Sequence, residues 1–438
     1  MITADHTGRW ITIARYMRNP ARYMLAMGVG KDLVHFRLGP RDFWLVNHPD
    51  LIEQVLTRPD GLVRDQVFRE ARRFIGQGHT TMDGPLHRER RRLVEPTLHA
   101  GEIERYRERI VKRATERSES WDDGAVVDIN GEMLELMLWV LTDVLLDADL
   151  EQDAPEIDEA VAATLKVVHR LFLPGAGVLW RLPLPATRRF NDAIARSDAL
   201  IYRMIRERRE SNGGRADVLA ALIRDGGGDA RELDDRQVRD ELVTLLFGGR
   251  GDLAQATTWG WHLLAEHPDV ERRWHDELEC VLAGSPPAAD ALSALPYTRA
   301  LFWEVLRICP PGWVFVREAA ADYDLGEFLV PKGAAIMISP LVTHRDARYW
   351  PDPLRFDPDR WSARAAEEPE RRFTDLTFGG GDRICPGRHL AAMVGPLVLA
   401  TIGQRWRPRS VPGERVEETG AFNLEPKGGL RMRLERRR

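Results

Sequence analysis

The spacing of apolar residues predicts a chain dominated by α-helices between about residues 84 and 309. Through this stretch, apolar side chains recur three and four positions apart, as they do on one face of an α-helix. A second helical run, over residues 388–402, follows the last cysteine. The clearest runs in the first stretch cover residues 103–113, 133–146, 193–208 and 241–265.

Short alternating runs predict small β-rich portions outside this helical body. They lie near residues 34–46, 313–338 and 422–434, and prolines and glycines punctuate the second portion. No fixed-period repeat and no linker-like composition divides the chain. We therefore expect one domain over residues 1–438, mainly α-helical with small β-sheets.

Composition narrows the class of protein further. With 43% hydrophobic and 30% charged residues, the chain can bury a large core and keep a solvated surface. Its apolar runs are far shorter than the ~20 residues that a membrane-spanning helix needs, and its start lacks the pattern of a secretory signal. We expect a cytoplasmic protein without a membrane span.

Charge and residue usage add two expectations. The net charge of -5 gives no general attraction to nucleic acid, so no nucleic-acid partner is expected. Nearly all positive charge is arginine, and alanine is abundant, a bias typical of GC-rich bacterial genomes. The 3 cysteines are too few and too scattered for a disulfide framework, which directs attention to the chemistry of a single thiolate.

The most informative stretch is Phe-Gly-Gly-Gly-Asp-Arg-Ile-Cys-Pro-Gly at residues 378–387. Its glycines allow backbone conformations closed to other residues, and Gly387 permits close approach to a flat ligand. Cys385 precedes the helix that we predict from Arg388, where exposed N–H groups and the helix dipole favour a thiolate. Such a sulfur is a good axial donor to haem iron. The alternative is a glycine-rich turn with an inert cysteine.

The fixed positions of this stretch resemble the haem-ligand loop of the cytochrome P-450 family, Phe-x-x-Gly-x-Arg-x-Cys-x-Gly. The resemblance implies the cytochrome P-450 fold as a single haem-thiolate domain. It implies haem b as the cofactor, with the Cys385 thiolate as axial ligand. It also implies that Phe378, Arg383 and Gly387 contact the cofactor, with Arg383 at a haem propionate.

A second signal lies in the apolar helix predicted over residues 298–309. Glu304 and Arg307 are three residues apart there and share one helix face. An exposed pair of this kind is common and contributes little to stability. However, Phe-Asp-Pro-Asp-Arg-Trp at residues 356–361 resembles the family motif that completes a Glu-Arg-Arg network. The resemblance implies that Glu304, Arg307 and Arg360 are structural and hold the loop that carries Cys385.

Candidate propionate-binding residues occur in two further segments. His87 and Arg91 lie four apart at a helix start that resembles the propionate-binding segment of the family, and such a pair can hold a carboxylate. Arg317 occupies the strand position of a further propionate-binding arginine. The neighbouring basic residues are interpreted as a solvated face, namely Arg88, Arg90 and Arg92.

The run over residues 247–254 departs from the central-helix pattern of the family. Gly248 and Gly249 match the oxygen-binding groove, but Gly251 replaces the acid and Asp252 stands at the threonine position. Three interpretations remain open. Asp252 delivers protons as an acid of raised pKa; a substrate hydroxyl completes the relay; or the outcome is coupling, desaturation, rearrangement or peroxide-driven oxidation. The role of Arg250 stays open as well.

The resemblance implies an oxidoreductase that oxidises an apolar small molecule with dioxygen and two electrons, most simply by hydroxylation. Apolar segments at residues 68–74, 171–178, 242–256, 313–316 and 422–424 favour a terpene or another secondary metabolite. We expect no fused flavin or iron-sulfur module within these 438 residues. Electrons from NAD(P)H are therefore expected through a ferredoxin and its reductase, or a flavodoxin, docking near Arg388 and Arg91 on a monomer.

Two alternatives come from other classes of protein. The spacing of Gly249, Gly251 and Ala254 satisfies a loose dinucleotide fingerprint, which would indicate an NAD-dependent dehydrogenase, although the alternation of strands and helices that such a fold needs is absent. The altered central run would also suit a non-catalytic haem protein.

Overall fold

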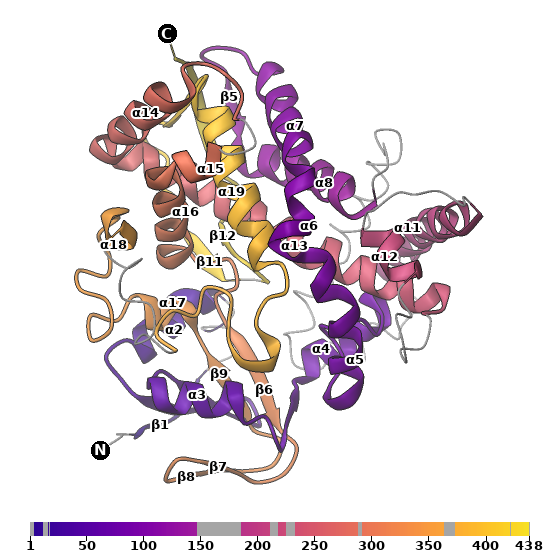
Figure 1. Cartoon of the computed structure of the whole chain (residues 1–438). Coiled ribbons are helices and arrows are strands. Elements are labelled where there is room, and N and C mark those ends of the chain that lie inside the picture. Colours follow the sequence, from indigo (N-terminus) through magenta and orange to yellow (C-terminus); the bar gives the residue numbers. More distant parts are fainter. Residues whose placement is uncertain are drawn as a thin grey trace. The chain divides into compact units, whose positions relative to one another are not determined.

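A computed structural model of the chain describes residues 4–11, 16, 18–146, 185–210, 218–224, 233–287, 291–362, 373–420 and 422–437. The chain groups into two compact units (Figure 1). The first unit comprises Met1–Asp65, Ile110–Met133 and Asp252–Arg438, and the second comprises Gln66–Arg109 and Leu134–Gly251.

The first unit is built on a six-stranded mixed sheet of order β1-β2-β3-β9-β6-β4. The β1–β2 and β3–β9 pairs are parallel, and the β2–β3, β6–β9 and β4–β6 pairs are antiparallel. Its strands are β1 (Ala4–Ile11), β2 (Leu33–Leu38), β3 (Arg41–Val46), β4 (Leu62–Arg64), β6 (Phe315–Ala319) and β9 (Ala335–Ile338).

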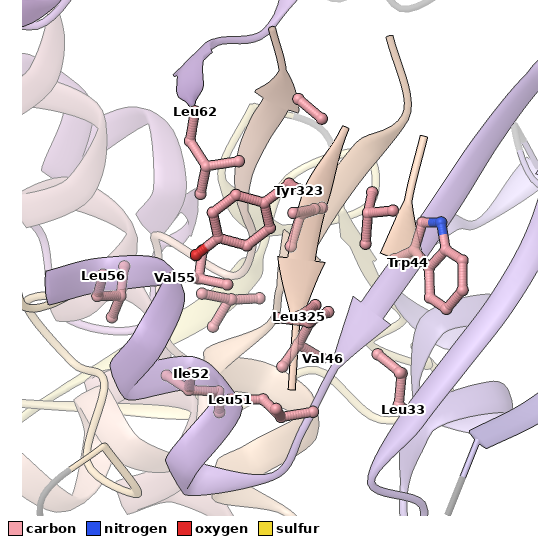
Figure 2. Close-up of a cluster of buried hydrophobic side chains, with 14 of the residues drawn as sticks. Leu33, Trp44, Val46, Leu51, Ile52, Val55, Leu56, Leu62, Tyr323 and Leu325 are labelled. Atoms are coloured by element: carbon pink, nitrogen blue, oxygen red, sulfur yellow. The ribbon is translucent and has the colours of Figure 1, made fainter. Parts of the chain in front are cut away.

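Helix α3 (Pro49–Thr57) covers part of this sheet with one apolar face. Pro49 lies in its first turn, where its missing N–H costs no hydrogen bond. The ring of the N-cap residue His48 accepts a hydrogen bond from Asp50 N, which satisfies one free N–H of that turn. Figure 2 shows its leucine, isoleucine and valine side chains directed toward Tyr323 and Leu325. The same buried cluster includes Leu376, which anchors the segment leading into the cysteine loop.

Smaller sheets and a group of helices complete the first unit. A three-stranded antiparallel sheet has the order β10-β13-β5, and two hairpins pair β7 with β8 and β11 with β12. The strands are β5 (Val126–Asp128), β7 (Tyr323–Leu325), β8 (Phe328–Val330), β10 (Trp406–Ser410), β11 (Glu418–Gly420), β12 (Leu424–Pro426) and β13 (Arg431–Arg436). The helices are α2 (Pro20–Gly28), α14 (Pro268–Leu282), α15 (Ala291–Ala294), α16 (Pro296–Ile308), α17 (Pro340–His344), α18 (Asp359–Ser362) and α19 (Arg388–Gly403).

Glycines allow the helices of the first unit to approach closely. In α19, a Cβ at Gly395 would collide with the ring of Phe302 in α16, and a Cβ at Gly403 would collide with Trp274 in α14. Both aromatic side chains are fully buried and have no room to move aside. The helix that follows the cysteine loop is therefore packed rigidly against α14 and α16.

The described residues of the second unit form helices joined by loops and turns, with no strand among them. Helices α8 (Ile129–Leu146) and α13 (Asp235–Glu266) contribute residues to both units. A buried hydrogen bond of 2.6 Å joins the His79 ring to Glu241, and Arg239 Nε donates to Asp198 at 2.8 Å. The other helices are α4 (Gln66–Ile75), α5 (Gly84–Val94), α6 (Ala100–Ile103), α7 (Arg107–Glu119), which also continues into the first unit, α11 (Pro185–Glu210) and α12 (Val218–Arg224).

The expected fold class is confirmed, with three differences in detail. The helix predicted over residues 103–113 is interrupted by a 3₁₀ turn, Glu104–Tyr106, between α6 and α7. The C-terminal β-rich portion begins upstream of residue 422, since it includes β10 and β11. Strands β1, β4 and β5 were not predicted, and β5 lies within the stretch predicted to be helical. The single-domain boundaries remain a prediction.

The fold bears on two expectations from the sequence, the dinucleotide fingerprint and the membrane span. The glycines of the loose dinucleotide fingerprint lie in the interior of α13, not in a turn between a strand and a helix. A dehydrogenase of the expected type is therefore excluded. Among the helices that the structure describes, none is both long and apolar enough to cross a bilayer.

Candidate functional site

The three cysteines of the chain differ sharply in their surroundings, and none forms a disulfide. Cys309 is buried at the end of α16, where burial raises the pKa of its thiol to about 12. Cys280 is exposed in the last turn of α14. Cys385 is half-buried and lies just before α19. It is the cysteine best placed to act as a thiolate.

Hydrogen bonds and glycines shape the loop that carries Cys385. The Cys385 N–H donates to Phe378 O at 2.8 Å, which closes the loop. Gly379 and Gly381 have φ of 73° and 62°, a region that favours glycine. A Cβ at Gly381 would also collide with the carbonyl oxygen of Leu56 in α3. The backbone of the loop therefore requires glycine at these two positions.

Cys385 lies two residues before Gly387, the N-cap residue of α19. Because the N-cap residue is Gly387, no N-cap side chain accepts a hydrogen bond from the N–H groups of the first turn. These groups and the dipole of the 16-residue helix favour negative charge beside them. A Cβ at Gly387 would lie 3.8 Å from Cys385 Sγ, so glycine keeps the space beside the sulfur open. The donor set and the open approach fit a flat haem bound through this sulfur.

Helix α16 of the first unit carries a fully buried carboxylate, that of Glu304. Glu304 and Arg307 both have side chains with 0% exposure, and two hydrogen bonds of 2.8 Å join them. Arg360 Nε donates to Glu304 Oε1 at 3.3 Å, and Trp361 Nε1 donates to Glu304 Oε2 at 2.8 Å. The backbone N–H of Asp357 completes the set at 3.1 Å. The structure thus brings Glu304, Arg307 and Arg360 together around one carboxylate.

His344 connects this network to the cysteine loop. Its Nε2 accepts a hydrogen bond from Leu376 N at 2.9 Å, so the ring proton is on Nδ1, which donates to Arg307 O at 3.1 Å. Burial lowers the pKa of His344 to about 4, which keeps the ring neutral, as this pattern requires. Gly379 N in turn donates to Leu376 O. An unbroken series of contacts therefore runs from Glu304 to the loop.

Phe378 braces the loop from its other side. Its ring meets Trp303 of α16 edge to face, with the ring centroids 5.4 Å apart. Trp303 also contacts Trp361, so the aromatic contacts return to the residues around Glu304. The loop is fixed by both polar and aromatic contacts.

The candidate propionate-binding residues fall in both units. In the first unit, Arg317 lies on β6 and is buried, and Arg383 is half-buried in the short 3₁₀ turn Gly381–Arg383. In the second unit, His87 and Arg91 are buried on one face of α5, and Arg91 pairs with Glu95 at 3.3 Å. Because Arg91 is buried, it is not part of an exposed docking surface.

Arg90 corrects the interpretation of the basic residues of α5. Arg88 and Arg92 are exposed as expected, but Arg90 is 8% exposed. It lies three residues after His87, so it shares the buried face of the helix. Its Nη1 has no hydrogen-bond partner among the described residues. A buried, unsatisfied cationic donor beside His87 and Arg91 fits an anionic group such as a carboxylate.

The central helix α13 places the unusual Gly-Asp pair inside regular helix. A Cβ at Gly248 would meet no atom within 4 Å, whereas one at Gly249 would lie 3.1 Å from Leu141 of α8. Asp252 is half-buried, and its Oδ1 accepts a short hydrogen bond from Asn423 Nδ2. Desolvation by the surrounding protein raises the pKa of Asp252 to about 7, against the smaller opposing effect of the Asn423 bond.

Two predicted features of the site gain no assigned role from the structure. Arg250 is buried on α13, and its guanidinium gives no further indication of its role. Of the apolar segments expected to line a substrate pocket, residues 171–178 lie outside the described residues.

Nearly the whole chain matches a known protein family. The family model described as Cytochrome P450 matches residues 12–429. The chain belongs to the cytochrome P-450 family. It is similar to cyclooctatin synthase of Streptomyces melanosporofaciens, with 37% identity over 95% of this chain and 91% of the relative. Pentalenene oxygenase of Streptomyces avermitilis is 32% identical, over 96% of this chain and 94% of the relative.

Solved structures agree with the fold assignment. The heme domain of cytochrome P-450DA matches with a TM-score of 0.82, over 97% of this chain and 93% of that chain, at 21% identity. The retinoic acid-bound cyanobacterial CYP120A1 matches with a TM-score of 0.80, over 93% and 92% of the two chains, at 22% identity. This cytochrome P-450 is an enzyme, which removes the non-catalytic alternative. It uses haem with a cysteine thiolate ligand, and its electrons come from NAD(P)H through redox partners.

Sequence reasoning missed several residues of this site, among them Arg90, Trp361 and Asn423. Arg90 could have been found from its spacing to His87, which places both on one helix face. Trp361 was part of a quoted motif but received no role. Asn423 gave no signal, because 171 residues separate it from Asp252 and only the folded chain brings them together.

Replacing Arg307 by lysine tests the network around Glu304. Lysine keeps the charge but cannot form the paired guanidinium bonds or reach the carbonyls of His344 and Pro353, which Arg307 Nη1 contacts at 2.9 and 2.8 Å. We expect Arg307→Lys to lower the free energy of unfolding by about 3 kcal/mol, measured by urea titration. The matched control is Arg431→Lys, which alters an exposed pair with Glu414 and should change it by less than about 0.5 kcal/mol. Equal effects of the two substitutions would contradict a stabilising network.

Proposed function

We propose that the chain is a bacterial cytochrome P-450 monooxygenase that hydroxylates a terpene. The observation that carries the proposal is the half-buried Cys385 at the start of α19, in the loop that the family uses to bind haem iron. The names of the relatives support the substrate class. One is a pentalenene oxygenase, and another, 36% identical, is a cyclooctat-9-en-7-ol 5-monooxygenase.

In this proposal, haem b is bound through the Cys385 thiolate. The family resemblance assigns the propionates to Arg317, Arg383, His87 and Arg91, and Gly387 allows the ring to approach the loop. Phe378 supports the loop beside the sulfur through its contact with Trp303. When bound, the haem supplies the oxidising chemistry, using dioxygen and two electrons.

The residues of the central helix supply space and protons. Gly248 and Gly249 would form the oxygen-binding groove on α13. A side chain at Gly248 would occupy open space, whereas a Cβ at Gly249 would press against Leu141 of α8. Asp252 has a pKa near neutrality, so its carboxyl can hold a proton at physiological pH and donate it. Asp252 thereby takes the place of the missing acid-alcohol pair. Hydroxylation then needs no acid at position 251, where this chain has glycine.

Further parts of the proposal concern partners and location. A ferredoxin, reduced by its reductase, would deliver the electrons, docking on a basic surface that includes Arg388, and a flavodoxin could serve in its place. The short apolar runs and the soluble-type composition support a cytoplasmic monomer.

Spectroscopy of the haem protein tests the central assignment. Cys385 supplies the sulfur in this proposal, so Cys385→Ser should abolish the red-shifted carbon monoxide spectrum of the reduced protein. Cys280→Ser is the matched control and should leave that spectrum unchanged. Wild-type protein should also show an absorbance shift of the haem with terpenes, and less with fatty acids of similar size. A retained thiolate spectrum in Cys385→Ser would refute the proposal.

The pH dependence of coupling tests Asp252. Because its carboxyl is protonated below its pKa of about 7, product formed per NADPH should be highest below pH 7 and fall as pH rises through about 7. Asp252→Asn removes the titrating group and should remove this step, and Asp252→Ala should impair coupled turnover more than haem binding. Glu425→Gln is the matched control, because burial also raises the pKa of Glu425. An unchanged pH profile in Asp252→Asn would exclude Asp252 from proton delivery.

A further inference from the structure

The hydrogen bond between Asp252 and Asn423 joins two parts of the first unit that are far apart in sequence. Asp252 lies on α13, and Asn423 lies between β11 and β12. Asn423 is 6% exposed, and its Nδ2 donates to Asp252 Oδ1. Among the described residues, Asn423 is the polar side chain that contacts the Asp252 carboxyl.

Asn423 is held in place independently of Asp252. The next residue, Leu424, is fully buried, and its N–H donates to Pro311 O at 3.0 Å. Its carbonyl oxygen accepts a hydrogen bond of 2.9 Å from Trp259 Nε1. Trp259 lies seven residues after Asp252 on α13, so both hydrogen bonds to the β11–β12 hairpin come from one face of the helix. The backbone beside Asn423 is therefore fixed on both sides of the Leu424 peptide, and the Asn423 amide extends from it to the Asp252 carboxyl.

The oriented carboxyl keeps one oxygen available. Asn423 engages Oδ1, and no described residue donates to Oδ2. Desolvation raises the pKa of Asp252 to about 7. The carboxyl is therefore about half protonated at pH 7 and can both donate and accept a hydrogen bond. Leu253 and Ala256, which lie nearby along α13, are buried apolar residues. One turn earlier on the helix, Gly248 faces open space.

We propose that the Asp252–Asn423 pair binds a hydroxyl group of the substrate, so that the enzyme prefers a terpene that already carries an alcohol over the parent hydrocarbon. This inference rests on the proposed function and specifies the substrate class. A hydroxyl both donates and accepts, which matches a carboxyl that can do either. A hydrocarbon at the same place would leave a buried carboxyl without a partner on Oδ2, which costs binding free energy. Asp252 is a substrate-binding residue in this account, and Asn423 is a positioning residue.

Binding to the haem-loaded protein tests the inference without turnover. The probes are matched pairs of a terpene hydrocarbon and its alcohol on one skeleton, such as cedrane and cedrol, titrated by the absorbance shift of the haem. The measured quantity is the ratio of the two dissociation constants. In the wild type, the alcohol should bind more tightly. In Asp252→Leu, which keeps the approximate shape but loses the hydrogen bonds, the preference should fall by about tenfold.

Three further variants separate orientation from packing. Asn423→Ala should lose roughly threefold of the preference, since the carboxyl is no longer oriented. Asp252→Asn keeps hydrogen-bonding groups and should restore most of it. Thr257→Val is the matched control: the Thr257 hydroxyl already bonds to Leu253 O at 2.9 Å within α13, so its removal should leave the ratio unchanged.

The possible failures are distinguishable. A ratio that changes by less than about twofold in Asp252→Leu, while both ligands still bind, overturns the inference and leaves the proposed function intact. A wild type that responds to neither member of any pair contradicts the terpene function, and the inference falls with it. An equal loss in Thr257→Val would assign the effect to general packing of α13 and would also overturn the inference.

Discussion

The buried Glu304 carboxylate is the interaction on which the cysteine loop depends. A carboxylate with no exposure to water is costly unless donors replace the water that it loses. Here Arg307 donates twice, and Arg360, Trp361 and the Asp357 N–H donate once each. The carboxylate is therefore satisfied only when α16, the segment before α18 and α18 itself are in place. Its burial makes the arrangement of these elements specific.

That arrangement reaches the reactive sulfur through a short series of contacts. The backbone carbonyl of Arg307 accepts a hydrogen bond from His344 Nδ1, and His344 Nε2 accepts one from Leu376 N. Leu376 in turn belongs to the buried core between α3 and the sheet. Gly379 and Gly381 then turn the backbone so that Cys385 reaches the start of α19. A thiolate ligand must keep its position while electrons arrive and oxygen is activated, and a loop fixed from several sides meets that need.

The sequence was sufficient to predict local elements and motif residues. Helical periodicity identified α8, α13 and α19, because their buried faces repeat at three and four positions. The cysteine motif was recognisable because its glycines and arginine have fixed offsets. The burial of Arg90 was mispredicted, since basic residues are usually solvated and only tertiary packing decides which face of α5 is covered.

Contacts between distant segments could not be predicted in the same way. No local pattern indicates that Asn423 meets Asp252, or that His344 lies between Arg307 and Leu376. These contacts form because sheets and helices from remote parts of the chain pack together, and hydrogen bonds then satisfy the polar groups that packing buries. Asp252 was recognisable in the sequence as a departure from the family pattern, but its hydrogen bond to Asn423 was not.

The most direct measurement of the central claim follows two signals during urea unfolding of Arg360→Ala haem protein. Arg360 reaches both Glu304 and the Pro351 carbonyl, at 3.3 and 2.8 Å, so its loss should loosen the network before the helices unfold. We expect the absorbance of the thiolate-bound haem to be lost at a lower urea concentration than the helical circular dichroism signal, with a smaller separation in the wild type. Coincident transitions in the variant, with the thiolate signal kept until the helices unfold, would contradict the account.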